Sequence, residues 1–119
     1  MDYEKLFRSF PGAVTVCDRE GVILAMNEKA RETFAADGGE RLLGTSVLAC
    51  HPEPARTKLK GMLAEGRTNI YTIEKAGLKK LIYQAPWTED GAYRGFLELT
   101  LVIPEKMPHF IRGASGGAE

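Results

Sequence analysis

The sequence lacks the features that are typical of membrane proteins and nucleic-acid-binding proteins. Its longest apolar run, residues 96–103, is interrupted by Glu98 and is far shorter than the ~20 residues of a membrane-spanning helix. Sixteen Lys and Arg residues balance 16 Asp and Glu residues, so no net charge attracts a phosphate backbone or an anionic lipid surface. We therefore expect neither nucleic acid nor a membrane as a partner.

Cysteine is scarce, and no segment with the pattern of a secretory signal is visible. Only Cys17 and Cys50 are present, and the amino end is a mixed polar stretch without an apolar core behind it. We expect a cytoplasmic protein with free thiols, because a reducing compartment disfavours a disulfide. Together with His51 and His109, the two cysteines show none of the paired short spacings of structural zinc sites, so no metal site is expected.

Motifs of nucleotide chemistry are also missing. Neither the P-loop pattern nor Gly-x-Gly-x-x-Gly occurs, and the acidic residues are spread over turns and strands instead of being paired. We expect a protein that is not an enzyme. What is present is the composition of a globular domain, since 119 residues with 44% hydrophobic side chains are enough to build one core without metal or disulfides.

Residues 1–12 predict an amphipathic helix. Large apolar side chains recur there with helical spacing, namely Tyr3, Leu6, Phe7 and Phe10. Asp2 is placed to cap the amino end, and Pro11 and Gly12 end the helix. The apolar face covers either the sheet of its own domain or that of a second copy, and we expect a homodimer through this helix.

Residues 13–104 predict an α+β domain. Two β-branched segments, residues 13–17 and 22–26, flank a turn that begins with Asp18 and ends with Gly21, which predicts a hairpin. Helices are expected at residues 28–35 after Asn27, in a short stretch capped by Thr45 or Ser46, and from Pro54 to Gly66. Strands are expected at residues 68–75, 78–87 and 94–103, with a loop over residues 88–91. This order predicts a five-stranded antiparallel sheet with short helices packed on one face, followed by a flexible C-terminal tail at residues 105–119.

The last strand presents two alternating rows of side chains. One row contains Leu97, Leu99, Leu101 and Ile103, and the other contains Phe96, Glu98, Thr100 and Val102. We expect the leucines to face the core, which places Glu98 on the outward face. On the inner face, Glu98 could instead bind a ligand donor or carry a raised pKa.

These residues resemble a PAS domain over about residues 4–103. The resemblance is carried by the run from Ala13 to Asn27 with its Asp-x-x-Gly turn, the Leu43-Gly44 step, and the strand that contains Gly91-Ala92-Tyr93-Arg94-Gly95-Phe96-Leu97-Glu98-Leu99. It implies a sensory module whose sheet and helices enclose a small cavity that often holds a cofactor or metabolite. It also implies dimerisation through a leading helix and an output domain or signalling partner.

The candidate cofactor-binding residues are Cys50, His51, Met62, Tyr71, Tyr83 and Phe96. Where the resemblance places Cys50 and His51 beside the cavity, either side chain could be an axial ligand of haem. Their alternative roles are local, with Cys50 packing as a small hydrophobe and His51-Pro52 forming an extended step. Met62 and the aromatic residues, Trp87 included, line a pocket or fill the core, depending on the strand register.

A photosensor that forms a flavin-cysteine adduct is not expected. Light-oxygen-voltage members of the family share a Gly-x-Asn-Cys-Arg-Phe-Leu-Gln segment, and the corresponding segment here, residues 44–51, has Val47 in place of the reactive cysteine. The cofactor therefore remains unknown. We expect a sensor of an unidentified small molecule that signals through its termini or dimer interface, and the alternative is a ligand-free dimerisation or protein-interaction module.

Overall fold

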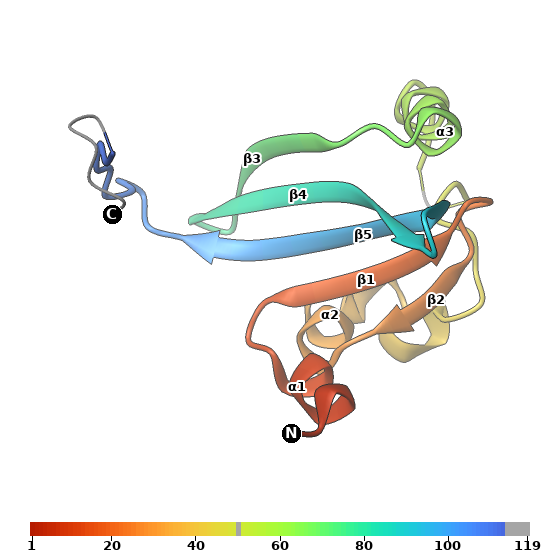
Figure 1. Ribbon diagram of the computed structural model, residues 1–119, viewed down its shortest axis with the longest axis horizontal. Helices are drawn as coiled ribbons and strands as arrows, with labels where there is room; N and C mark the ends of the chain where they lie inside the picture. The colour runs from red at the N-terminus through yellow and green to blue at the C-terminus, as the bar shows by residue number, and fades with distance from the viewer. Residues whose placement is uncertain (50, 114–119) are drawn as a thin grey trace.

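Five antiparallel strands form one sheet in the order β2-β1-β5-β4-β3 (Figure 1). The computed structural model describes residues 1–49 and 51–113. The strands are β1 (Ala13–Asp18), β2 (Ile23–Met26), β3 (Asn69–Lys75), β4 (Leu78–Glu89) and β5 (Ala92–Ile103). The helices are α1 (Tyr3–Ser9), α2 (Glu28–Thr33) and α3 (Ala55–Glu65), with two 3-10 turns, η1 (Ala35–Asp37) and η2 (Gly39–Leu42). The predicted five-stranded sheet with a few short helices is confirmed.

The first hairpin forms as the sequence predicts. The Asp18 carboxylate accepts hydrogen bonds from the backbone N–H groups of Glu20 and Val22, each at 2.9 Å, and Gly21 takes a positive φ of 87°. β1 then pairs with the long strand β5, where a Cβ atom on Gly95 would overlap the backbone carbonyl of Cys17. Only glycine allows the strands to approach this closely, so Gly95 fixes where β1 meets β5.

Asn27 joins three parts of the chain. Its side chain is fully buried, and Oδ1 accepts hydrogen bonds from the backbone N–H of Val14 at 2.9 Å and of Ala30 at 3.0 Å. Its Nδ2 donates to the carbonyl oxygens of Gly12 at 2.8 Å and Phe10 at 3.3 Å. The residue that caps α2 therefore also fixes β1 and the segment that leaves α1.

The predicted short helix at residues 45–49 is wrong. This segment lies along β2, where the Thr45 carbonyl accepts from the N–H of Ile23 at 2.9 Å and the Val47 N–H donates to the Gly21 carbonyl at 2.8 Å. Ser46 also forms an isolated bridge with Val22. The backbone groups that a helix would need are used in these bonds, so Thr45 and Ser46 stabilise turns instead of a helix.

The inner face of β5 is the row that contains Glu98, contrary to the expectation that the leucines face the core. Phe96 and Thr100 are 6% and 9% exposed, whereas Leu97, Leu99 and Leu101 are only half-buried on the opposite face. The reason is the register, since β5 pairs Phe96 with the buried Cys17.

The turn between β4 and β5 is also shorter than expected, because β4 continues to Glu89 and β5 begins at Ala92.

The two predicted longer helices form, but they pack differently. α3 ends at Gly66 with a left-handed φ of 66° and buries Met62 and Leu63. α1 is capped by the Asp2 carboxylate, which accepts from the N–H of Lys5 at 3.1 Å, yet none of its residues is buried. Among the helices of residues 1–49 and 51–113, none combines the length and apolar character of a membrane span.

Replacing Asn27 with Ala should destabilise the fold by about 2–4 kcal/mol, because the buried N–H groups of Val14 and Ala30 would lose their acceptor. Urea denaturation monitored by circular dichroism measures this change. Asn69→Ala is the control, since the Asn69 side chain is half-buried and makes one hydrogen bond, to Gln84, so its loss should cost less than about 1 kcal/mol. Equal costs for the two variants would contradict this role of Asn27.

Candidate ligand-binding cavity

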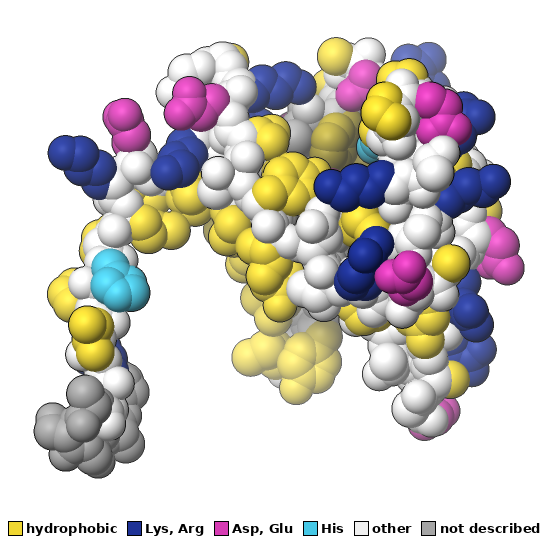
Figure 2. Space-filling model, turned by 90° about the horizontal axis from the view of Figure 1, so that it is seen from above, with side chains coloured by type: hydrophobic (Ala, Val, Ile, Leu, Met, Phe, Trp, Pro, Cys, Tyr) yellow, Lys and Arg dark blue, Asp and Glu magenta, His cyan; other side chains and the backbone are white. Residues whose placement is uncertain are grey.

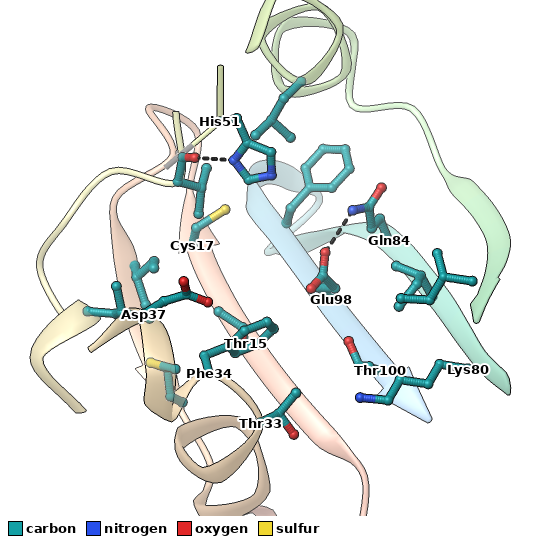
Figure 3. A pocket seen from close by; sticks show the side chains of 18 of the residues that line it. Thr15, Cys17, Thr33, Phe34, Asp37, His51, Lys80, Gln84, Glu98 and Thr100 are labelled. Carbon is teal, nitrogen blue, oxygen red and sulfur yellow. Dashed lines mark hydrogen bonds between the residues drawn. The ribbon is translucent and has the colours of Figure 1, made fainter. Parts of the chain in front are cut away.

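A cavity of ≈ 380 Å³ lies between the inner face of the sheet and the helical segments. Its volume is within the range of small-molecule sites, about 300–1,000 Å³. The residues around it come from β1, β2, α2, the 3-10 turns, the segment before α3, α3 itself, and the inner rows of β3, β4 and β5. Figure 3 shows these side chains pointing toward a common space from both the sheet and the helices.

One end of the cavity, around Phe96, is apolar. It is lined by Cys17, Leu63 and Phe96, which pack in one buried cluster. Ile23 and Met26, which belong to a second cluster, add apolar lining, and all five side chains are nearly completely buried. Burial raises the pKa of the Cys17 thiol, which is free and unreactive in this setting because the thiolate is the nucleophilic form. In the described ranges, no three His, Cys, Asp or Glu side chains gather closely enough to hold a metal ion.

A row of polar side chains crosses three strands on the wall formed by the sheet. Asn69 Nδ2 donates to Gln84 Oε1 at 3.1 Å, and Gln84 Nε2 donates to Glu98 Oε2 at 2.7 Å. The three residues are directly opposite one another in the strand pairing, Asn69 with Gln84 and Gln84 with Glu98. Figure 3 shows the Glu98 carboxylate and the Gln84 amide facing the cavity.

Tyr71 lies beside this polar row on β3. Partial burial raises the pKa of its phenol, and the negative charge of Glu98 raises it further. The cavity therefore contains a phenol that stays protonated at neutral pH and can donate a hydrogen bond. Lys75 and Lys80 line the cavity toward the β3–β4 turn, and Asp37 lines it from η1.

His51 lies at the opposite wall. Its Nδ1 is 2.6 Å from the backbone carbonyl oxygen of Val47, and a carbonyl can only accept, so Nδ1 carries the hydrogen. In the neutral imidazole, Nε2 is then an acceptor, and Figure 3 shows it turned toward the cavity. A carbonyl that orients one ring nitrogen in this way is also typical of histidines that bind metal through the other.

The structure brings some of the predicted cofactor-binding residues together and separates others. His51, Tyr71 and Phe96 line the cavity, whereas Met62 is buried against Cys17 and Phe96 without lining it. Tyr83 lies on the outer face of β4, because its neighbours Ile82 and Gln84 face the cavity and side chains alternate along a strand. Cys50 lies outside the described residues.

Two residues of the site differ from the sequence-based expectation. Glu98, expected to face outward, and Gln84, which the sequence pattern did not single out, both belong to the wall of the cavity. The sequence signal that could have found them is Gly95, since a glycine within an alternating strand marks a close approach of two backbones, here that of β1. Pairing at this point places Phe96 opposite Cys17, and Glu98 then shares their face.

The profile of the PAS fold family matches residues 7–105. The chain belongs to the PAS family. PAS domains are generally sensory, non-catalytic modules, so the family supports a role in signal sensing. No curated protein matches the chain in sequence.

Solved structures show the same fold at low sequence identity. A C-terminal domain from Streptococcus mutans superposes with a TM-score of 0.68 at 16% identity, over 84% of this chain and 81% of that one. The PAS domain of BvgS from Bordetella pertussis has a TM-score of 0.61 at 20% identity, covering 87% and 85% of the two chains. A receptor from Vibrio cholerae, described as a dual PAS-haem oxygen sensor, has a TM-score of 0.56 at 18% identity, covering 78% and 95%.

Proposed function

We propose that this PAS domain is a non-catalytic sensor that binds a small molecule in the cavity between its sheet and its helices. The observation that carries the proposal is the cavity itself, which joins an apolar end around Phe96 to a polar wall around Glu98. Such a combination gives a ligand both buried apolar area and a fixed orientation. A domain whose core served only for folding would gain stability by closing this space.

The elements that surround the cavity suggest how binding is relayed. α3 contributes Leu59 and Leu63 to the cavity, and the Tyr93 hydroxyl holds its last turn by donating to the Leu63 carbonyl at 2.7 Å. A ligand that fits one position of α3 better than another shifts the population toward that position. In this proposal residues 13–104 are the sensor, and residues 105–119 lead to an output domain or partner. Residues 114–119 lie outside the residues that the structure describes. The cytoplasmic location expected from the sequence stays a prediction.

A screen of cellular metabolites by thermal shift tests the cavity. We expect at least one compound to raise the Tm of the wild-type chain and to lose this effect in Thr15→Phe, because Thr15 lines the cavity and a phenyl ring there would occupy it. Thr72→Phe is the matched control, since Thr72 is exposed and its neighbours Tyr71 and Ile73 take the inner face. A stabilising effect that survives in Thr15→Phe would place the ligand elsewhere, and no stabilising compound at all would support the ligand-free alternative.

Haem is a second candidate ligand, supported by His51. The Nδ1 of His51 is fixed by the Val47 carbonyl and Nε2 is turned to the cavity, as an axial ligand requires. Lys75 and Lys80 also line the cavity and would supply positive charge for the propionate groups of haem. When bound, haem would supply a centre for diatomic gases or for electron transfer.

Reconstitution with haem distinguishes this candidate. We expect His51→Ala to shift or abolish the Soret band of the haem-loaded protein, because the axial nitrogen would be lost. His109→Ala is the control, since His109 is exposed and is not part of the cavity. Identical spectra for the wild type and His51→Ala would show that His51 does not ligate haem.

We further propose that α1 mediates a homodimer. Tyr3 and Leu6 are 75% and 54% exposed, and hydrophobic side chains also reach the surface over the sheet (Figure 2). Leu81, Leu97, Leu99 and Leu101 are only half-buried on the outer face of the sheet. Pairing of these surfaces between two copies would remove apolar area from water at about 25 cal/mol per Å².

Light scattering of Leu6→Glu checks the dimer. We expect the mass to fall toward that of the monomer, because a carboxylate would be placed in the apolar contact. Ser9→Glu introduces the same side chain on the same helix at a residue outside the apolar set, and its mass should match that of the wild type. A wild-type mass for Leu6→Glu, or for a chain lacking residues 1–11, would argue against α1 as the interface.

A further inference from the structure

The Glu98 carboxylate is a half-buried charge on the wall of the cavity. Among the described residues its only hydrogen-bond donor is Gln84, which reaches Oε2 at 2.7 Å and leaves Oε1 without a protein donor. The three ion pairs of these residues, Arg8–Glu4, Arg67–Glu65 and Arg94–Glu89, are all at the exposed surface and do not include Glu98. A half-buried carboxylate with one neutral partner favours a cation in contact with it.

Neither lysine of the cavity forms an ion pair with Glu98 in the described part of the chain. Lys80 pairs with Val102, whereas Gln84 pairs with Glu98, so Lys80 lies four residues further along β4. Four residues of an extended strand span about 13 Å. Burial raises the pKa of the Cys17 thiol and of the Tyr71 phenol, and the negative charge of Glu98 adds to the rise of each.

Other groups near Glu98 are suited to a ligand that donates hydrogen bonds. The hydroxyls of Thr15 and Thr100 can accept, and the imidazole of His51 presents Nε2 from the opposite wall. Asp37 adds a second carboxylate on the helical side of the cavity. The aromatic rings of Phe34 and Phe96 also line it, and the face of such a ring attracts a cation.

The apolar end limits how polar the ligand can be. Leu63 and Phe96 offer no conventional hydrogen bonds, so the part of a ligand that lies there has to be aliphatic or aromatic. This end lies beside Phe96, two residues from Glu98 on the same face of β5. One molecule of moderate size can therefore reach both the apolar end and the carboxylate.

We propose that the cavity selects an organic ammonium compound, with a protonated amine bound to Glu98 and an apolar body packed against Phe96 and Leu63. This assignment rests on the proposed function, since it names the chemical class of the ligand that the cavity binds. An ammonium group offers three hydrogens, which match Oε1 of Glu98 and the neighbouring acceptors. An anion of the same size would be repelled by the negative charge of Glu98 at this position.

Three matched compounds test the assignment by calorimetry and thermal shift at millimolar concentration. They are 2-phenylethylamine as the cation, 2-phenylethanol as the neutral analogue and 3-phenylpropionate as the anion. We expect the amine to bind the wild-type chain at least tenfold more tightly than the alcohol, because a hydrogen bond to a charged group is stronger than a neutral one. The anion should bind more weakly than both.

Glu98→Gln is the decisive variant. It keeps the shape and an oxygen that accepts from Gln84 but removes the charge, so the preference for the amine should fall about tenfold. Glu74→Gln is the control, because Glu74 is exposed on β3, faces away from the cavity and carries the same charge. The amine should bind this control as it binds the wild type.

The outcomes separate the two proposals. Equal affinity of the amine and the alcohol, or an unchanged preference in Glu98→Gln, would overturn the ammonium assignment while leaving the cavity as a ligand site. If 3-phenylpropionate bound more tightly than the amine, the ammonium assignment would be overturned in favour of an anion held by Lys75 and Lys80. Failure of the amine to bind would also overturn it, whereas the sensor itself is tested separately by the metabolite screen with Thr15→Phe.

Discussion

The pairing of β1 with β5 is the constraint on which the cavity depends. It places Phe96 opposite Cys17 and Glu98 opposite Thr15, and so decides which row of β5 meets the helices. A shift of one residue would turn Leu97 and Leu99 inward and move the Glu98 carboxylate to the outer face. Gly95 holds this register, because no larger residue fits against the Cys17 carbonyl.

The sequence was sufficient to predict the elements whose ends are set by local chemistry. The Asp18 turn, the Asn27 cap and the Gly66 stop all act within a few residues, and each is found where it was expected. The helix predicted at residues 45–49 was wrong because this segment is hydrogen-bonded along β2, which lies far from it in sequence. Helix capping patterns cannot reveal that a segment's backbone groups are already bonded to a strand edge.

The cavity was harder to predict for a related reason. Both rows of β5 contain large apolar side chains, so periodicity alone favours neither face, and the three leucines suggested the wrong one. Tyr83 and Tyr71 were equivalent in sequence, yet the pairing of β4 with β3 and β5 turns Tyr71 to the cavity and Tyr83 away. Long-range register, which one sequence does not encode locally, separates lining residues from surface ones.

The hydrogen-bonded row of Asn69, Gln84 and Glu98 has a fixed direction. A carboxylate can only accept, so it turns the Gln84 amide nitrogen toward itself, and the Gln84 oxygen in turn receives the Asn69 amide. Asn69 is the first residue of the edge strand β3, three residues after Gly66 ends α3. The negative charge of Glu98 on β5 thus determines how the Asn69 amide is oriented at the edge of the sheet, two strands away.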